Sequence, residues 1–398
     1  MNNPYSELEK SILKQNRKLK VLKYLRPINE SREKEKFLKE QKEPNFEYRT
    51  NPNFNEKEVR KSFKKIVIPI KPDYRLKNMA EGIERMYDYK VKFSNKKINK
   101  TLRKLSIPYL NVVKNIFAKI KILNNLGNSK IIKEETAKIY GIPSEDTVRK
   151  AKDVLNNLKK CESPKSDIKP EYVKKVMYDK IKEYGLDKDG WICKISKKKR
   201  ATLTSSLSKE IKIGNRMYPK NILNSLAVHE VGVHAVLANN GAKQPFKIFN
   251  FGFPLQSKTN EGLATYFERT KDCLNDFKLK KYAVRCLAVY NVLEGNSFKS
   301  TFKKLRSYDL DEEMSWEISM RAHRGGGCIK DHIYFEGLEE IKNYNGSYKV
   351  LFTGRVSFNY VELIEEMMEK GFIKSPEDEG MIFPDFAKKV NQLKILDF

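Results

Sequence analysis

The chain has 398 residues, of which 39% are hydrophobic and 11% aromatic, so it can bury a sizeable core and does not have the composition of a disordered protein. Its apolar runs, such as KIVIPI, are far shorter than a membrane span, and its first residues, MNNPYSELEK, lack the apolar segment of a signal peptide. The five cysteines are scattered and form no C-x-x-C pair, which is typical of reduced thiols. Together with a net charge of +29, these features predict a folded cytoplasmic protein without a membrane partner.

The first 160 residues are predicted to form a basic, mainly helical lobe. Charged helices are expected over 6–25 and 32–42, and further Lys- and Ile-rich helices over 77–160. Residues 1–200 carry 26 of the 29 net positive charges. This excess indicates either a docking surface for an acidic partner or a lysine-rich coding bias, because Lys outnumbers Arg by 63 to 17. No helix-turn-helix, zinc-finger or RNP signature is present, which disfavours nucleic acid as that partner.

Residues 161–398 are predicted to form a second lobe that begins with a helix and a small sheet. The helix should begin at Pro170 and end at Gly185. A further helix is expected with Pro219 in its first turn and its end at Asn239-Asn240-Gly241. Between these helices, alternating apolar residues predict strands over 191–195, 201–207 and 211–213.

The second of these helices contains the hexapeptide HEVGVH, which includes two of the four histidines of the chain. In the common zinc-protease motif the histidines are four residues apart, whereas His229 and His234 are five apart. Five steps on a regular α-helix rotate the second side chain by about 140° from the first. A one-residue π-bulge would bring both onto one face, and Gly232 between them would ease such a bulge. Glu230, beside the first histidine, is the candidate general base.

Glu261, in the run NEGLAT, is the third candidate ligand. Ser257 or Thr259 is expected to cap its helix, and Gly262 would permit the close approach of two helices that metal ligation from both would require. Two imidazoles and a carboxylate form the ligand set of a catalytic Zn²⁺ site with one open position. The alternative is structural: a buried helix with hydrogen-bonded histidines, and an acid that favours the positive end of its helix.

HEVGVH followed by NEGLA resembles the microtubule-associated tyrosine carboxypeptidases, whose bacterial relatives carry a QEGLA motif. This chain has Asn260 at the position of the bacterial glutamine, which is not a ligand. The resemblance spans roughly residues 20–380 as one continuous domain and implies a carboxypeptidase that removes a C-terminal tyrosine. It extends to LRPINESREKEKFL (25–38), IYGIPSEDTVRKAKDVL (139–155), IKIGNRMYPKNILNSLAVHE (211–230) and RAHRGGGCIKDHIYFEGL (321–338).

The segment 321–338 gathers basic and aromatic side chains around three glycines. Arg321, Arg324 or Lys330 could hold the free C-terminal carboxylate of a substrate, since arginine does this with two parallel hydrogen bonds. Tyr334, or one of His323 and His332, could donate to a developing oxyanion. The alternative is a glycine-rich turn with solvated basic residues.

We therefore predict an α+β, predominantly helical, zincin-like metallopeptidase with a small sheet before the motif helix. Residues 1–160 would be the basic lobe and 161–398 the catalytic lobe. His229, His234 and Glu261 would bind Zn²⁺, Glu230 would be catalytic, and the substrate would be the C-terminus of a peptide or protein, acidic if the basic lobe docks it. The alternative is a basic docking or regulatory protein that keeps the fold without turnover.

Overall fold

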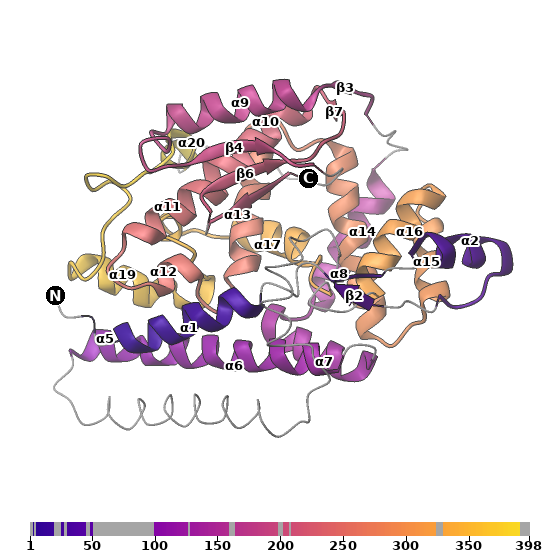
Figure 1. Cartoon of the computed structure of the whole chain (residues 1–398), viewed down its shortest axis with the longest axis horizontal. Helices are drawn as coiled ribbons and strands as arrows, with labels where there is room; N and C mark the ends of the chain where they lie inside the picture. The colour runs from indigo at the N-terminus through magenta and orange to yellow at the C-terminus, as the bar shows by residue number, and fades with distance from the viewer. Residues whose placement is uncertain are drawn as a thin grey trace.

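The computed structural model is mainly helical, with small sheets of two, two and three strands among the residues that it describes (Figure 1). No helix in this part of the chain is long and apolar enough to cross a membrane. The described residues are 3, 5–19, 25–27, 30–44, 48–50, 99–125, 128–158, 164–197, 202–206, 208–323 and 329–390.

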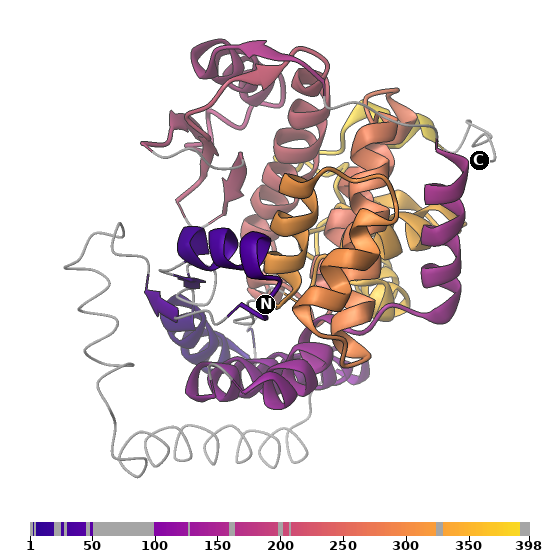
Figure 2. The same cartoon turned by 90° about the vertical axis from the view of Figure 1, so that its right-hand side faces the viewer.

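Most described residues of the N-terminal part are helical, as predicted from their pattern, although Leu25 begins a strand. Of the helices predicted over 77–160, the part over 77–98 lies outside the described residues. α1 lies against α6, and α6 packs on α7 along the side of the molecule opposite the three-stranded sheet (Figures 1 and 2). Short strands β1 and β2 pair antiparallel on either side of α2. The bounds are α1 Ser6–Leu19, β1 Leu25–Pro27, α2 Glu30–Glu40, β2 Tyr48–Thr50, α5 Lys100–Lys104, α6 Ser106–Asn124, α7 Ser129–Tyr140 and α8 Glu145–Asn157.

The predicted small sheet is confirmed. Its order is β4-β6-β5, with β4 parallel and β5 antiparallel to the central strand, so β5 is an edge strand. Cys193, Ile211 and Ile213 face the core, whereas Ile192 and Leu203 are exposed. The bounds in this region are β3 Ser166–Ile168, α9 Pro170–Glu183, β4 Ile192–Ile195, β5 Leu203–Ser205, β6 Glu210–Ile213 and β7 Tyr218–Pro219.

The rest of the chain is a set of helices packed around the motif helix and α13. The motif helix is continuous from α10 (Ile222–Leu226) through the π-helix η2 (Ala227–Ala235) to α11 (Val236–Lys243), and α13 (Gln256–Thr270) packs against it. The remaining elements are α12 Ile248–Phe251, α14 Asp276–Leu293, α15 Phe298–Arg306, α16 Glu312–His323, α17 Ile333–Lys342, α18 Tyr348–Leu351, the 3-10 helix η3 Phe358–Tyr360, α19 Val361–Glu369 and α20 Asp385–Lys389.

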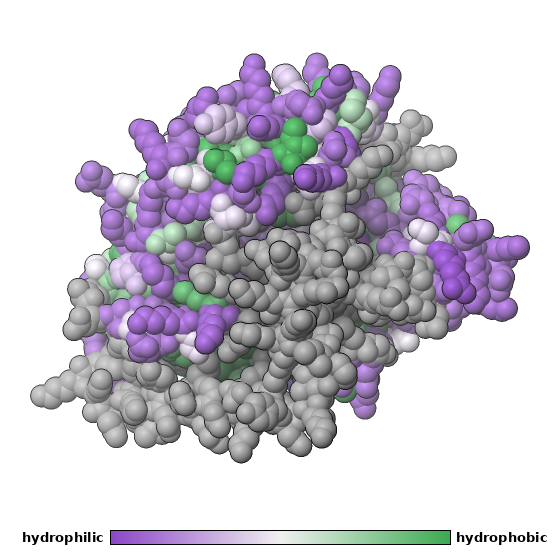
Figure 3. Space-filling view, viewed as in Figure 1, coloured by the Kyte–Doolittle hydropathy of each residue, from purple (hydrophilic) through white to green (hydrophobic). Residues whose placement is uncertain are grey.

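The interior joins both predicted lobes. One cluster of buried apolar side chains includes Tyr5 and Ile116 from the N-terminal half and Val231, Leu263 and Phe335 from the C-terminal half. Where the face in Figure 3 is coloured, it is mostly hydrophilic, with a few small hydrophobic areas between the hydrophilic residues. The motif helix is therefore supported by a core to which elements from along the described chain contribute.

Three local predictions around the motif helix are wrong. Pro219 is not in a first helical turn but in β7, which pairs with β3. The helix does not end at Asn239-Asn240-Gly241, because the side chain of Asn240 is held in the interior by the backbone of Phe352 and Ile382. Finally, α13 is preceded by Leu255 in the left-handed conformation, with no side-chain cap from Ser257 or Thr259.

The sequence predicts that Gly262 lets the two ligand-bearing helices approach closely; a helix does approach it closely, but that helix is α17 and not the motif helix with the two histidines. A Cβ at this position would lie 2.3 Å from the backbone carbon of Gly337 in α17, and a Cβ on Gly337 would lie 2.3 Å from the carbonyl oxygen of Lys258. The two helices thus meet backbone to backbone. This contact fixes α13, which carries Glu261, against α17, which carries Tyr334.

We expect Gly262→Ala to destabilise the protein by about 1–3 kcal/mol or more, because overpacking against backbone cannot be relieved by a rotamer change. Urea unfolding measures the loss. Gly232→Ala is the matched control, since its Cβ would lie 2.9 Å from the ring of Phe386, a side chain that can move. An equal or smaller loss for Gly262→Ala would contradict the tight contact.

Candidate metal centre

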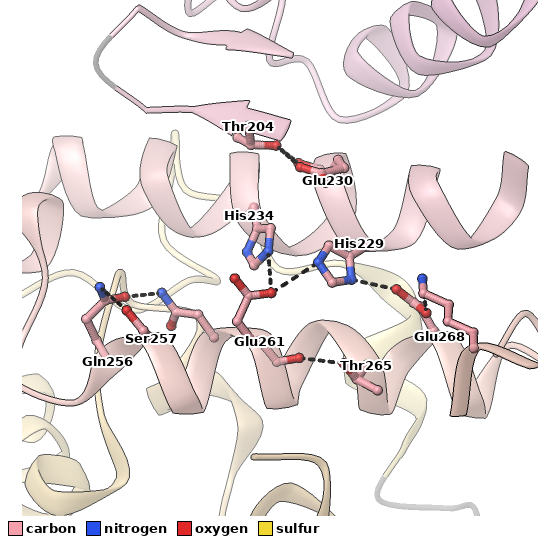
Figure 4. A network of polar contacts seen from close by, with 11 residues as sticks. Thr204, His229, Glu230, His234, Gln256, Ser257, Glu261, Thr265 and Glu268 are labelled. Carbon is pink, nitrogen blue, oxygen red and sulfur yellow. Dashed lines mark hydrogen bonds and ion pairs between the residues drawn. The ribbon is translucent and has the colours of Figure 1, made fainter. Parts of the chain in front are cut away.

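His229 and His234 lie on one face of the π-helix η2 (Figure 4). Their ring centroids are 4.6 Å apart and their planes are nearly perpendicular, at 87°. At the end of the π-helix, the backbone N–H of Val236 donates to the carbonyl of Val231, five residues earlier, as well as to that of Val233. The π-type backbone predicted from the spacing is therefore present, and it extends over nine residues rather than a single bulge.

Gly232 has a different role from the one predicted. It is not among the residues with positive φ, so the π-helix does not require the conformational freedom of glycine there. Its missing side chain instead makes room for Phe386 of α20 and the hydroxyl of Tyr184, which pack on that side of the helix. The requirement for glycine arises from packing.

Glu261 of α13 reaches the two imidazoles from the facing helix (Figure 4). Its Oε2 lies 3.3 Å from Nε2 of His229 and 3.4 Å from Nε2 of His234, and the three candidate ligand atoms lie within 4.8 Å of one another. This oxygen is buried but makes no hydrogen bond of good geometry. Two imidazole nitrogens and an orphaned carboxylate oxygen that converge in this way fit a Zn²⁺ ion.

The pKa values of Glu261 and His229 are both shifted by the charged groups around them. Burial alone would raise the pKa of Glu261, but the charge of His234 and contacts with both imidazoles hold this pKa well below its ordinary value. Burial likewise opposes the charged form of His229, yet the carboxylates of Glu268, Glu261 and Glu230 raise its pKa to about 10. The pocket therefore favours a cation among these carboxylates.

Glu268 is a buried residue of the site that the sequence analysis missed. Its Oε1 lies 2.5 Å from Nδ1 of His229, and its Oε2 accepts a 2.6 Å hydrogen bond from Lys278, which also donates to Ser225. Because a carboxylate only accepts, Nδ1 carries the proton and Nε2 is free to bind a metal. Glu268 is seven residues after Glu261, two helical turns along one face, and this spacing could have indicated it.

We expect Glu268→Gln to weaken zinc binding by about 10–100-fold, because a carboxylate that accepts a hydrogen bond from a ligand histidine orients the ring and raises its basicity. Competition with a chelator of known affinity measures the change. The matched control is Glu135→Gln, another buried carboxylate paired with lysines, in α7. Unaltered zinc affinity in Glu268→Gln would show that the contact with His229 has no part in metal binding.

Glu230 extends from the motif helix toward the sheet, on the side away from Glu261 (Figure 4). Its carboxylate accepts a 2.6 Å hydrogen bond from the hydroxyl of Thr204, which also lies 2.9 Å from the backbone carbonyl of Glu230. Thr204 belongs to the edge strand β5 and was not identified from the sequence. One hydroxyl thus fixes both the side chain and the backbone of the candidate base.

Of the three cations predicted to bind the substrate, Arg321 and Lys330 lie in the described residues, and both already contact other side chains. Arg321 forms two hydrogen bonds with Asp331, at 2.7 and 3.0 Å, so its guanidinium is already engaged by a carboxylate. Lys330 lies over the ring of Tyr140, 5.4 Å from its centroid. Arg324 is outside the described residues.

Of the three possible oxyanion donors, Tyr334 is the one on whose pKa the charge of Glu261 acts. Its ring stacks on that of Tyr282 at 5.0 Å, and burial together with the charge of Glu261 raises its pKa well above the ordinary value. His323 contacts Thr301, and the ring nitrogens of the buried His332 make no hydrogen bond.

Fold and site together define a mainly helical protein with a His–His–Glu group able to hold a metal and an acid next to the first histidine. The family model described as microtubule-associated tyrosine carboxypeptidase matches residues 34–398, and the chain belongs to this family. The resemblance seen in the HEVGVH and NEGLA motifs is thereby confirmed.

Individual relatives are more distant. The chain is 27% identical to microtubule-associated tyrosine carboxypeptidase 1 of Rattus norvegicus over 157 residues, which cover 35% of this chain and 32% of that protein. It is 28% identical to the protein of the same name from Homo sapiens over 133 residues, covering 30% and 27%. The chain thus spans about a third of the length of these relatives. No solved structure matches.

Proposed function

We propose that this protein is a zinc-dependent carboxypeptidase with a zincin-like site, which removes a C-terminal residue from a peptide or protein. The observation that carries the proposal is the convergence of His229, His234 and Glu261, with a buried oxygen of Glu261 left without a hydrogen bond. Membership of the tyrosine carboxypeptidase family supports the carboxypeptidase activity and makes tyrosine the residue to test first.

The proposed mechanism assigns one task to each group. His229, His234 and Glu261 would hold Zn²⁺, which supplies Lewis acidity toward the carbonyl oxygen of the scissile bond. Glu230 takes the proton of the attacking water and delivers it to the leaving amine. The hydroxyl of Thr204 keeps the carboxylate of Glu230 in one orientation, and the hydroxyl of Tyr334 donates to the oxyanion.

Three features of the chain bear on which substrate it would bind. An exopeptidase must recognise a free terminal carboxylate, and Arg321, Arg324 and Lys330 are the cations that the sequence suggested. A substrate with an acidic tail would be attracted by the excess of lysine in residues 1–200. An extended peptide could also pair with the edge strand β5, beside Thr204 and Glu230.

The direct test combines metal analysis with hydrolysis of peptides that end in tyrosine. We expect about one zinc per chain and release of the last residue that stops with a chelator and returns with added Zn²⁺. Hydrolysis of an acidic-tailed protein should weaken with salt, whereas hydrolysis of a short neutral peptide should not. Zinc-loaded protein without turnover on any C-terminal peptide would favour a docking or regulatory role.

A further inference from the structure

If the protein is a carboxypeptidase, as proposed above, a cation must hold the terminal carboxylate of the substrate near the metal centre. Arg321 is poorly suited, because Asp331 already occupies two of its donors, and Arg285 also approaches Asp331, at 3.9 Å. A guanidinium without a carboxylate partner would be better suited. Arg355 meets this requirement within the part of the chain that the structure describes.

Arg355 lies in a segment that is fastened to the elements around the metal centre. Its backbone N–H donates to the carbonyl of Phe249 at 2.8 Å, and its carbonyl accepts from the N–H of Phe253 at 3.0 Å. Three residues further on, the N–H of Phe358 donates to the hydroxyl of Thr259 in the first turn of α13. Because Thr259 is two residues before Glu261, this segment runs beside the turn that carries the third candidate ligand.

The Arg355 side chain is mostly buried and has few hydrogen-bond partners among the described residues. Its guanidinium has one long hydrogen bond, 3.5 Å from Nη1 to the carbonyl of Asn250. Among the described residues, no carboxylate lies within ion-pair distance of it. A buried arginine usually has an acidic partner, since an uncompensated buried charge costs several kcal/mol.

The surroundings make this guanidinium more suited to an anion. Burial lowers the pKa of Arg355, and the charge of Glu261 acts in the opposite direction, so the two charges are near enough to interact. Burial and the charges of Lys330 and Arg355 lower the pKa of Lys119 to about 8, so Lys119 also interacts with both of these cations. Because these like charges repel one another, the binding of an anion near them would be favourable.

We propose that Arg355 holds the free C-terminal carboxylate of the substrate, with Lys119 and Lys330 adding positive potential around it. A guanidinium binds a carboxylate through two parallel hydrogen bonds, so it fixes the direction as well as the position of the chain end. With the chain end anchored beside Glu261, the bond presented to Glu230 is one close to the C-terminus. Arg355 would thereby restrict the enzyme to exopeptidase cleavage.

The test measures binding, so that its result does not depend on turnover. Calorimetry with zinc-loaded Glu230→Gln protein compares one peptide ending in a free tyrosine carboxylate with the same peptide ending in an amide. We expect the free acid to bind roughly 10–100-fold tighter, as for a hydrogen bond to a charged group. Adding Arg355→Gln should abolish the preference, and Arg355→Lys, which keeps the charge but loses the fork, should retain part of it.

Three outcomes would overturn the proposal. They are an equal affinity of Glu230→Gln protein for acid and amide, a preference that persists in Arg355→Gln, and a preference lost in Arg321→Gln but kept in Arg355→Gln. Arg306→Gln, at the end of α15, is the matched control and should leave the preference intact. Zinc content and melting temperature show that each variant is folded. Failure of the proposed hydrolysis would appear separately, as the absence of chelator-sensitive turnover in the unmodified chain.

Discussion

Replacement of Glu230 by glutamine should leave zinc and fold in place and lower turnover by about 10²–10⁴-fold, the usual contribution of a general base. Glutamine has nearly the same shape as glutamate and can still accept a hydrogen bond from Thr204, but its amide cannot take a proton from water. The loss should therefore appear in kcat with a peptide that ends in tyrosine. Zinc content and melting temperature should stay close to those of the unmodified protein.

Variants of Thr204 provide matched controls for this prediction. Thr204→Val keeps the shape but removes the hydroxyl that donates to the carboxylate of Glu230 at 2.6 Å, so kcat should fall while KM changes little. Thr204→Ser keeps the hydroxyl and should retain most of the activity. Full activity in Glu230→Gln would assign the base to another residue, and full activity in Thr204→Val would remove its positioning role.

The features that could be predicted from the sequence are those set by local spacing. The interval between His229 and His234 cannot place both on one face of a regular α-helix, and the backbone there is a π-helix. Gly262 is unfavourable inside a helix unless another backbone approaches it, and Gly337 does so. In both cases, a feature that is unfavourable in a regular, isolated helix indicated how the folded chain is arranged there.

The features that could not be predicted depend on contacts between distant segments. Asn240 and Gly241 are typical of a helix end, yet the helix continues because Asn240 satisfies backbone groups of residues more than a hundred positions away. The same limitation applies to Arg321, whose availability depends on Asp331. Thr204 and Arg355 carry no motif, and only the folded chain brings Thr204 to Glu230 and the segment of Arg355 to the turn that carries Glu261.

The excess of lysine in residues 1–200 has two candidate explanations, a docking surface for an acidic partner and a lysine-rich coding bias. Lysine accounts for most of the positive charge in residues 1–200, and many described lysines form ion pairs on the surface, for example Lys10 with Glu7 and Lys182 with Asp179. Exposed pairs of this kind contribute little to stability. The salt dependence of hydrolysis therefore distinguishes an electrostatic docking surface from coding bias.

Replacement of His234 by alanine should abolish stoichiometric zinc binding, with a larger effect than the roughly 10–100-fold expected when a group that only orients a ligand, such as Glu268, is lost. The variant would retain His229 and Glu261. A catalytic zinc site needs three protein ligands, so these two would not hold the ion at full occupancy. The fold should survive, because His229 remains between the carboxylates of Glu261 and Glu268, at 3.3 and 2.5 Å.

The chain offers its own control, because only four histidines are present. His323→Gln removes an imidazole that contacts Thr301 in the region of α15 and α16, away from the candidate ligands, and should keep one zinc per chain. Metal analysis after dialysis, with circular dichroism to check folding, measures both variants. Full zinc occupancy in His234→Ala would show that the metal, if any, is bound by other residues, and the proposed mechanism would then have to be abandoned.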